Sequence, residues 1–182
     1  MDKWLVIGDR VPPLLEKMQA EMLQLVPAKG PLALVGIKGR GADLARRLLP
    51  GLKQQTGREI SLGFLDITLY RDDVGMAYPH PKVKGTELNF SLEGCHIFLV
   101  DDVFYTGRTT RAALDELMDY GRPASVLLAV LVDRGGRELP IRPDVVGIVV
   151  EAASDCSVEV RLQEVDGEEG IGTVRKNQGK GR

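Results

Sequence analysis

The chain has 182 residues, which is enough for one domain with a substantial hydrophobic core. Its composition, with 43% hydrophobic and 27% charged residues, is ordinary for a soluble globular protein. A formal net charge of −2 excludes a global attraction to nucleic acid or membrane, so any such partner must meet a local patch.

Targeting and redox signals are weak. The apolar runs are short and broken by charge, which predicts no transmembrane span, and the N-terminal run is too short for a convincing signal peptide. Cys95 and Cys156 fit no metal-ligand or redox spacing, so we interpret them as reduced thiols, with a secreted disulfide as the alternative. We therefore expect a cytoplasmic protein.

The first part of the chain alternates helical and strand patterns. Residues Val11–Val26 have the apolar stripe of an amphipathic helix, with prolines at its start, where they are tolerated. The apolar run Leu32–Ile37 predicts a buried strand. The next helical pattern, GADLARRLLPGL, is interrupted late by Pro50-Gly51, and Ile60–Tyr70 predicts another strand.

A patternless segment, 71–94, divides the chain and predicts a functional loop or a mobile flap. The elements predicted after it are strands at His96–Val100, Ser125–Val132 and Val145–Val150, a helix at Thr109–Tyr120, and an alternating edge strand at Ser157–Val165. Apolar strands alternating with helices predict an α/β fold with a mostly parallel central sheet flanked by helices. We expect one domain over 1–165 and a polar, frayed tail over 166–182.

Loops that follow the predicted strands are the candidate binding sites, because ligands bind such sheets at the carboxyl ends of the strands. The loop Gly36–Gly41, GIKGRG, opens a helix, and its glycines let backbone N–H groups turn towards an anion. Lys38 and Arg40 add two cations. The alternative is a tight turn with two solvated basic residues, and the spacing is not that of a Walker loop.

The most unusual stretch is IFLVDDVFYTGRTT, Ile97–Thr110, in which a buried strand ends on two adjacent carboxylates. When ionised, Asp101 and Asp102 only accept hydrogen bonds, which suits paired sugar hydroxyls or a hydrated magnesium ion. The following turn precedes a helix, so its N–H groups and hydroxyls suit a phosphate. The alternative makes Thr109 an N-cap and the aspartates solubilising residues, but it does not explain an acidic pair on a buried strand.

That stretch resembles the phosphoribosyl pyrophosphate signature of type I phosphoribosyltransferases. Together with DITLYRDD, Asp66–Asp73, and AVLVDRGGRELPIRPD, Ala129–Asp144, it is similar to the PyrR family of bifunctional pyrimidine-operon attenuators with uracil phosphoribosyltransferase activity. The resemblance covers roughly Leu32 to Val165 and is specific, because three long motifs occur in the family's order. It implies the type I phosphoribosyltransferase fold with a flexible flap.

The resemblance also implies a role for each loop. Asp101, Asp102 and the flap residue Arg71 are the expected catalytic residues, with Arg71 near the pyrophosphate and Mg²⁺ held by the aspartates through ribose hydroxyls or water. The flap closes over the substrate and excludes water. The expected residues for phosphoribosyl pyrophosphate are Lys38, Gly39, Arg40, Gly41, Asp101, Asp102, Val103, Tyr105, Thr106, Gly107, Arg108 and Thr109, and those for uracil are Val132, Asp133 and Arg134.

The implied reaction needs little acid–base machinery. A uracil nitrogen attacks the anomeric carbon as pyrophosphate leaves, through an oxocarbenium-like transition state stabilised by magnesium, N–H groups and cations. The two histidines fit this reaction, because His80 is interpreted as solvated and His96 as structural.

Three positions depart from the family's pattern. Gly39 stands where threonine is common, and Ala20 and Gly136 stand where histidine is usual, all at positions that the family associates with its RNA-facing surface. These changes remove polar contacts to RNA and leave the sugar-phosphate site nearly intact. Arg137 and Arg142 remain as candidate RNA contacts, with a solvated arginine cluster as the alternative.

The leading hypothesis is a uracil phosphoribosyltransferase that makes UMP and pyrophosphate from uracil and phosphoribosyl pyrophosphate. The alternative is a UMP-dependent RNA-binding attenuator of pyrimidine biosynthesis with weak or vestigial catalysis, whose partner is pyrimidine-operon leader RNA. A third interpretation is a phosphoribosyltransferase for another base, such as a purine. The resemblance implies a homo-oligomer, a dimer or larger.

Overall fold

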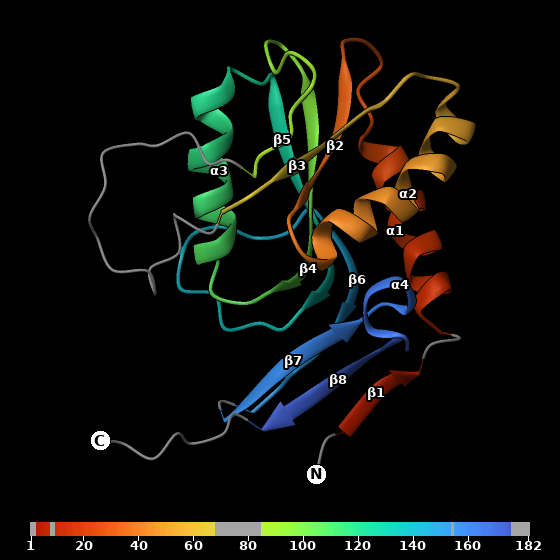
Figure 1. Ribbon diagram of the computed structural model, residues 1–182, viewed down its shortest axis with the longest axis vertical. Coiled ribbons are helices and arrows are strands. Elements are labelled where there is room, and N and C mark those ends of the chain that lie inside the picture. Colours follow the sequence, from red (N-terminus) through yellow and green to blue (C-terminus); the bar gives the residue numbers. More distant parts are fainter. Residues whose placement is uncertain (1–2, 8–9, 68–84, 154, 176–182) are drawn as a thin grey trace.

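The computed structural model describes residues 3–7, 10–67, 85–153 and 155–175. In this part of the chain, a five-stranded parallel sheet is flanked by helices, and a three-stranded antiparallel sheet lies below it in Figure 1. The strands of the parallel sheet, in spatial order, are β3 (Ser61–Leu65), β2 (Leu32–Ile37), β4 (His96–Phe104), β5 (Ser125–Asp133) and β6 (Val145–Val149).

Helices cover both faces of the parallel sheet. Helices α1 (Val11–Leu25) and α2 (Arg40–Thr56) lie on one side and α3 (Arg108–Tyr120) lies on the other (Figure 1). Alternate strand residues face opposite sides: Leu34 packs with α1 and α2, whereas Val35 packs with α3. Burial on both faces explains why these strands are continuous apolar runs, and it confirms the expected α/β architecture.

Helix α2 continues past the expected interruption. Pro50 lies inside the helix, which runs on to Thr56 and ends on Gly57 in the left-handed conformation. A proline removes one backbone hydrogen bond and normally kinks or ends a helix. Here the flanking Leu48 and Leu52 are fully buried against the sheet, so packing of the apolar face holds the helix together.

The C-terminal segment differs from the expected frayed tail. Helix α4 (Gln163–Asp166) leads into β8 (Gly170–Arg175), which pairs antiparallel with β1 (Lys3–Ile7) on one side and with β7 (Cys156–Arg161) on the other. Because of its glycines and the neighbouring charges, this strand is not evident from the sequence pattern, yet Ile171 is fully buried in the main core. The folded unit therefore extends to Arg175, and β7 is an edge strand of this second sheet.

Several expectations concern residues at the margins of the parallel sheet. Of the expected flap, 71–94, the part 71–84 lies outside the described residues, and with it Arg71 and His80. The His96 ring lies 2.8 Å from Ser125 Oγ at the amino ends of β4 and β5, opposite the candidate loops.

Cys95 and Cys156 are free thiols. None of the described helices is long and apolar enough to cross a membrane.

Candidate functional site

The acidic pair lies inside β4, which is longer than its apolar run. β4 pairs with β2 only as far as Val100, whereas it pairs with β5 as far as Phe104. Asp101 and Asp102 therefore lie where β2 has already turned away into the glycine loop. The carboxyl end of the sheet opens beside them, as expected for a ligand site in an open α/β sheet.

The two aspartates have different environments. Asp101 is only 8% exposed, and its Oδ1 accepts a hydrogen bond of 2.9 Å from the Asp102 N–H. Asp102 is half-buried and accepts a bond of 2.9 Å from the Val103 N–H. Burial, and then the nearby Asp102 charge, raise the pKa of Asp101 well above its usual value. A buried carboxyl of this kind gains most from a cation or from hydroxyl donors.

Glycines bring the start of α2 against this acidic pair. A Cβ on Gly41 would lie 2.6 Å from the Val100 carbonyl oxygen and 3.3 Å from Asp101 Oδ1, and one on Gly36 would lie 2.6 Å from Ala42 Cα. The helix begins after Gly39, whose φ of +107° is accessible to glycine, without a side-chain cap. Backbone N–H groups of the first turn are therefore placed beside the aspartates.

The second loop ends in the start of α3. Gly107, with φ of +89°, is the N-cap residue and provides no side-chain cap. Thr109 lies within the first turn, so the alternative in which it is the N-cap is wrong. Thr106 Oγ1 accepts a bond of 3.3 Å from the Arg108 N–H, which orders the turn. A second helix N-terminus, with positive potential and two threonine hydroxyls, thus follows β4 directly.

The third loop, which follows β5, contacts the loop that follows β4. Val132 is fully buried, and Asp133 Oδ1 accepts a bond of 2.8 Å from the Gly135 N–H. The Arg134 guanidinium lies 3.9 Å from the centre of the Tyr105 ring. Arg134 is 7% exposed, and its Nη2 donates to the carbonyls of Ala153 and Cys156 at 3.1 and 2.6 Å.

Arg134 also carries a buried donor with no acceptor. Within the described residues, its Nε is the one buried side-chain nitrogen or oxygen without a hydrogen-bond partner. Native proteins rarely leave such a group unpaired, because the lost hydration is costly. Arg134 lies over Tyr105, next to the turn at Thr106–Thr109, so this N–H can donate to an acceptor on a bound ligand.

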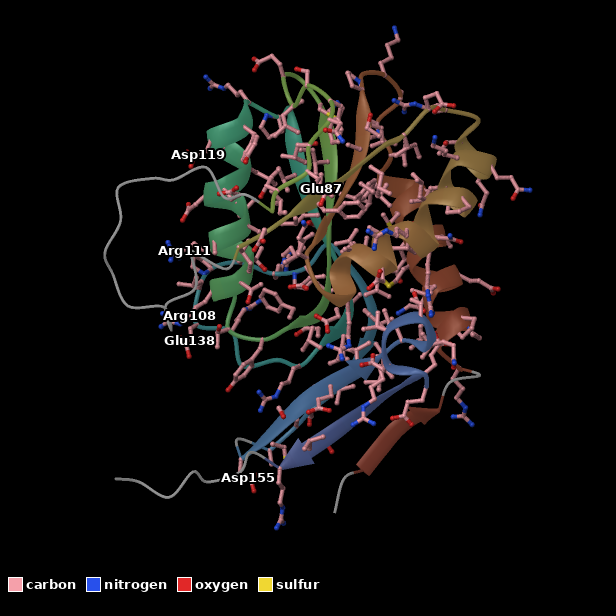
Figure 2. The ribbon with its side chains drawn as sticks, viewed as in Figure 1. Glu87, Arg108, Arg111, Asp119, Glu138 and Asp155 are labelled. Carbon is pink, nitrogen blue, oxygen red and sulfur yellow. The ribbon has the colours of Figure 1, made fainter. Side chains whose placement is uncertain are left out.

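The basic residues of the loops pair with carboxylates that the sequence did not connect to them. Lys38 Nζ donates to Glu87 at 2.8 Å, and Arg108 lies beside Glu138 at the lower end of α3 in Figure 2, with a contact of 2.9 Å. Arg40 makes two bonds to Asp166. These acids lie 30 to 126 residues away in the chain, so no local signal could have identified them.

The candidate RNA-facing positions are not gathered in one place. Ala20 is exposed on α1, at the right of Figure 1, whereas the loop with Gly136, Arg137 and Arg142 runs below α3 at the lower left. Both arginines are exposed, and neither has an ion-pair partner among the described residues. The arginine cluster with local salt bridges therefore finds no support in this part of the chain.

The family model for the phosphoribosyl transferase domain matches residues 14–161. A relative from Pelotomaculum thermopropionicum called "Bifunctional protein PyrR" is 52% identical, over 86% of this chain and 87% of its own. The relatives of the same name from Elusimicrobium minutum and Listeria monocytogenes (strain F2365) are both 45% identical, over 97% and 98% of this chain and 99% and 100% of theirs. The chain belongs to the PyrR family. The resemblance predicted from the three motifs is confirmed.

Solved structures agree on the fold of this PyrR family member. A hypoxanthine phosphoribosyltransferase of Trypanosoma cruzi has a TM-score of 0.68 and 18% identity, covering 96% of this chain and 97% of its own. An enzyme of the same name from Staphylococcus aureus also has a TM-score of 0.68 and 18% identity, with coverage of 97% and 93%. At this identity the likeness concerns the fold alone, and it confirms the type I phosphoribosyltransferase architecture.

Proposed function

We propose that the protein is a uracil phosphoribosyltransferase of the bifunctional PyrR type, making UMP and pyrophosphate from uracil and phosphoribosyl pyrophosphate. The observation that carries this proposal is the buried Asp101 beside Asp102, flanked by the uncapped N-termini of α2 and α3. Two acceptors between two anion-binding helix starts match a sugar with phosphates at both ends.

The proposed contacts would hold the sugar donor, phosphoribosyl pyrophosphate, in one orientation. Asp101 and Asp102 would accept hydrogen bonds from the ribose hydroxyls, and the turn at Thr106–Thr109 would bind the 5′-phosphate. The glycine loop Lys38–Gly41 would bind the pyrophosphate. Support comes from Gly41, which lets the start of α2 approach Asp101 so closely that one ligand can contact both. Val103 and Tyr105 would complete the wall between the ribose and phosphate subsites.

Uracil would lie against the loop after β5. Val132 offers an apolar wall, Asp133 and its neighbours offer backbone groups, and Arg134 offers the buried Nε–H that lacks an acceptor. A uracil carbonyl oxygen is an acceptor of the required kind. Because Tyr105 covers the Arg134 guanidinium, the base and phosphate subsites would be mechanically linked.

Magnesium fits this donor set. The described residues contain no group of three or more histidine, cysteine or acidic side chains able to cage a metal. Mg²⁺ commonly keeps water ligands and binds one or two carboxylates together with substrate phosphates, which the paired aspartates suit. When bound, the ion would neutralise part of the charge on the departing pyrophosphate.

Catalysis by this chain would depend on position and charge. The helix N-termini and Lys38 and Arg40 would stabilise the leaving pyrophosphate, and the aspartates would hold the sugar for attack by uracil. Arg71, in 68–84, belongs to the same proposal as a further cation near the pyrophosphate. The bond from the sugar to pyrophosphate can break without a side-chain acid or base, and the N–H proton of the attacking uracil nitrogen would pass to water or to the departing pyrophosphate.

A second activity, UMP-dependent binding of pyrimidine-operon leader RNA, is favoured by one observation. Arg137 and Arg142 are exposed without ion-pair partners among the described residues, so both are available to phosphates. Binding of leader RNA should be measured at moderate salt with and without UMP. An RNA affinity that does not depend on UMP would refute this second activity, and only the enzyme activity would remain proposed. A homo-oligomer and a cytoplasmic location complete the proposal.

The enzyme activity is tested by incubating the protein with phosphoribosyl pyrophosphate, Mg²⁺ and one nucleobase at a time. Chromatography should detect UMP with uracil and no nucleotide with hypoxanthine. A nucleotide formed from a purine alone would favour the third interpretation, and no product from any base would refute the proposed reaction.

A further inference from the structure

The basic residues of the candidate anion-binding loops already have ion-pair partners. Each pairs with a carboxylate from a distant part of the chain, so the site already holds negative charges where phosphates are proposed to bind. The three pairs are Lys38 with Glu87, Arg108 with Glu138, and Arg40 with Asp166. The pairs differ in the exposure of the carboxylate and in the geometry of the contact, and these two differences indicate two different roles.

Two of the pairs are open to solvent. The Lys38 and Glu87 side chains are 34% and 58% exposed, and those of Arg108 and Glu138 are 56% and 50% exposed. Exposed ion pairs contribute little and are screened by salt. A phosphate with two or more charges can therefore replace Glu87 or Glu138 as the partner of its cation.

The pair of Arg40 with Asp166 is built differently. Arg40 Nε donates to Asp166 Oδ2 at 3.2 Å and Arg40 Nη2 donates to Oδ1 at 2.7 Å, so the contact is bidentate. The Asp166 side chain is 18% exposed. Its Oδ2 also accepts a bond of 2.8 Å from the Leu162 N–H, which fixes the carboxylate before any ligand binds.

The segment that carries Asp166 is itself held on α2. Arg47, two turns after Arg40 and on the same face of the helix, pairs with Glu164 and Glu169. β8 then continues between β1 and β7. Asp166 is therefore part of a docked surface along α2, and exchange of this carboxylate for a phosphate would require the segment to move.

Electrostatics keep this pair charged. The bond to Asp166 raises the pKa of Arg40, and the negative charges of Asp166 and Asp102 raise it further. The bond from Arg40, followed by that from Leu162, lowers the pKa of Asp166. Both groups are thus ionised at neutral pH, and the contact does not act as a proton switch.

We propose that Asp166 is a positioning residue for pyrophosphate binding. It holds Arg40 by the edge formed by Nε and Nη2, and it leaves Nη1, which has no partner among the described residues, for a pyrophosphate oxygen. The C-terminal segment thereby takes part in donor binding without touching the donor. This inference rests on the proposed function, because it assigns the anion at Arg40 to the pyrophosphate of the sugar donor.

The test compares Asp166→Ala, Asp166→Asn and Asp166→Glu with the wild-type protein. Calorimetry would measure binding of phosphoribosyl pyrophosphate with Mg²⁺, and kinetics would give KM for each substrate and kcat. Release of an ordered arginine side chain predicts that Asp166→Ala raises KM and Kd for the donor by about threefold to tenfold, with KM for uracil unchanged. Asp166→Asn keeps one acceptor oxygen and should lie between wild type and Asp166→Ala.

A matched control lies two residues away. Glu164→Gln removes a carboxylate whose partner, Arg47, lies outside the proposed site, and the pair of Arg47 with Glu169 still holds the segment on α2. It should lower the melting temperature slightly and leave donor affinity unchanged. Asp166→Glu retains the charge and alters the geometry, so weakened donor binding in this variant would show that position, rather than charge, is responsible.

The outcomes separate the hypotheses. Tighter donor binding by Asp166→Ala would mean that Asp166 competes with pyrophosphate for Arg40, and unchanged binding would mean that Asp166 is only structural; either result overturns the inference. A wild-type protein that binds no donor would overturn the proposed function and the inference together. A wild-type protein that binds the donor but makes no UMP would refute only the proposed reaction, because the binding comparison remains measurable.

Discussion

Gly41→Ala tests whether the start of α2 must lie against the acidic pair. The added Cβ would lie 2.6 Å from the Val100 carbonyl oxygen and 3.1 Å from Asp101 Cα. Both atoms belong to the backbone of β4, in the centre of the parallel sheet, and cannot rotate away. The helix N-terminus must therefore retreat by several tenths of an ångström, and the glycine loop must move with it.

Two opposing contributions determine how much Gly41→Ala changes the free energy of unfolding. Alanine is favoured over glycine inside a helix by about 0.5–1 kcal/mol. Overpacking a rigid site costs about 1–3 kcal/mol, and contact with strand backbone belongs near the upper end. The net loss in the free energy of unfolding is then about 1–2 kcal/mol, or about 2–8 °C in melting temperature for a chain of this size.

The expected loss of activity is larger than the loss of stability suggests. A displacement of up to about 1 Å at a reacting site can lower the rate by about a hundredfold, so kcat/KM for phosphoribosyl pyrophosphate should fall by about tenfold to a hundredfold. The assay is UMP formation at a temperature well below the melting transition, combined with a calorimetric or spectroscopic melting curve.

Gly57→Ala is the matched control at the other end of the same helix. Gly57 has a φ of +63° and open space around its Cβ position, so alanine there costs about 1–2 kcal/mol of backbone strain without contacting the site. The two variants should lose similar stability, and only Gly41→Ala should lose activity. Equal kinetics in both variants would refute the view that contact between α2 and Asp101 organises the site.

Three further predictions follow from single contacts. Asp102→Asn should lower kcat/KM by about tenfold to a hundredfold with little change in melting temperature, because hydrogen bonds to charged groups contribute about 1.5–3 kcal/mol; unchanged kinetics would refute its role. The arginine partner of Glu164 lowers the pKa of this carboxyl below its usual 4.5, so the pair stabilises the fold above about pH 4.5 and loses this effect as pH falls further. Glu164→Gln should therefore lower the melting temperature by about 1–3 °C at pH 7 and by less towards pH 3, and a difference independent of pH would contradict this. A Cβ on Gly136 would lie 2.7 Å from the Tyr105 ring, whereas one on Gly135 would meet nothing within 4 Å, and both glycines have positive φ. Gly136→Ala should therefore raise KM for uracil more than Gly135→Ala does, and equal effects would show that Tyr105 does not hold the base loop.

The glycine at position 136 also has a structural explanation that the sequence alone did not provide. Comparison with the family's pattern predicts only the loss of an RNA contact at this position. In the structure, its open space accommodates Tyr105, which covers the Arg134 guanidinium. A histidine there would have to displace this ring, so the substitution changes the packing of the base loop as well as the surface.

The sequence by itself determined the parallel sheet and the edge of the sheet at which the candidate site is expected. Continuous apolar runs can be buried only between two layers of helices, and this requirement fixes β2, β4 and β5 without knowledge of their neighbours. The two glycine loops follow β2 and β4 directly, and the acidic pair lies near the carboxyl end of β4, directly after its apolar run. Their meeting at one edge is a consequence of parallel connection, so the sequence alone predicts that these loops lie close together.

Tertiary structure alone decided the features that depend on distant residues. β8 is too short and too rich in glycine to be recognised alone, and it forms between β7 and β1, which comes from the opposite end of the chain. Asp166 lies 126 residues from Arg40, so only the folded chain reveals their bidentate contact. Local patterns encode burial and backbone preference, whereas ion pairs and strand partners are selected by the geometry of the assembled fold.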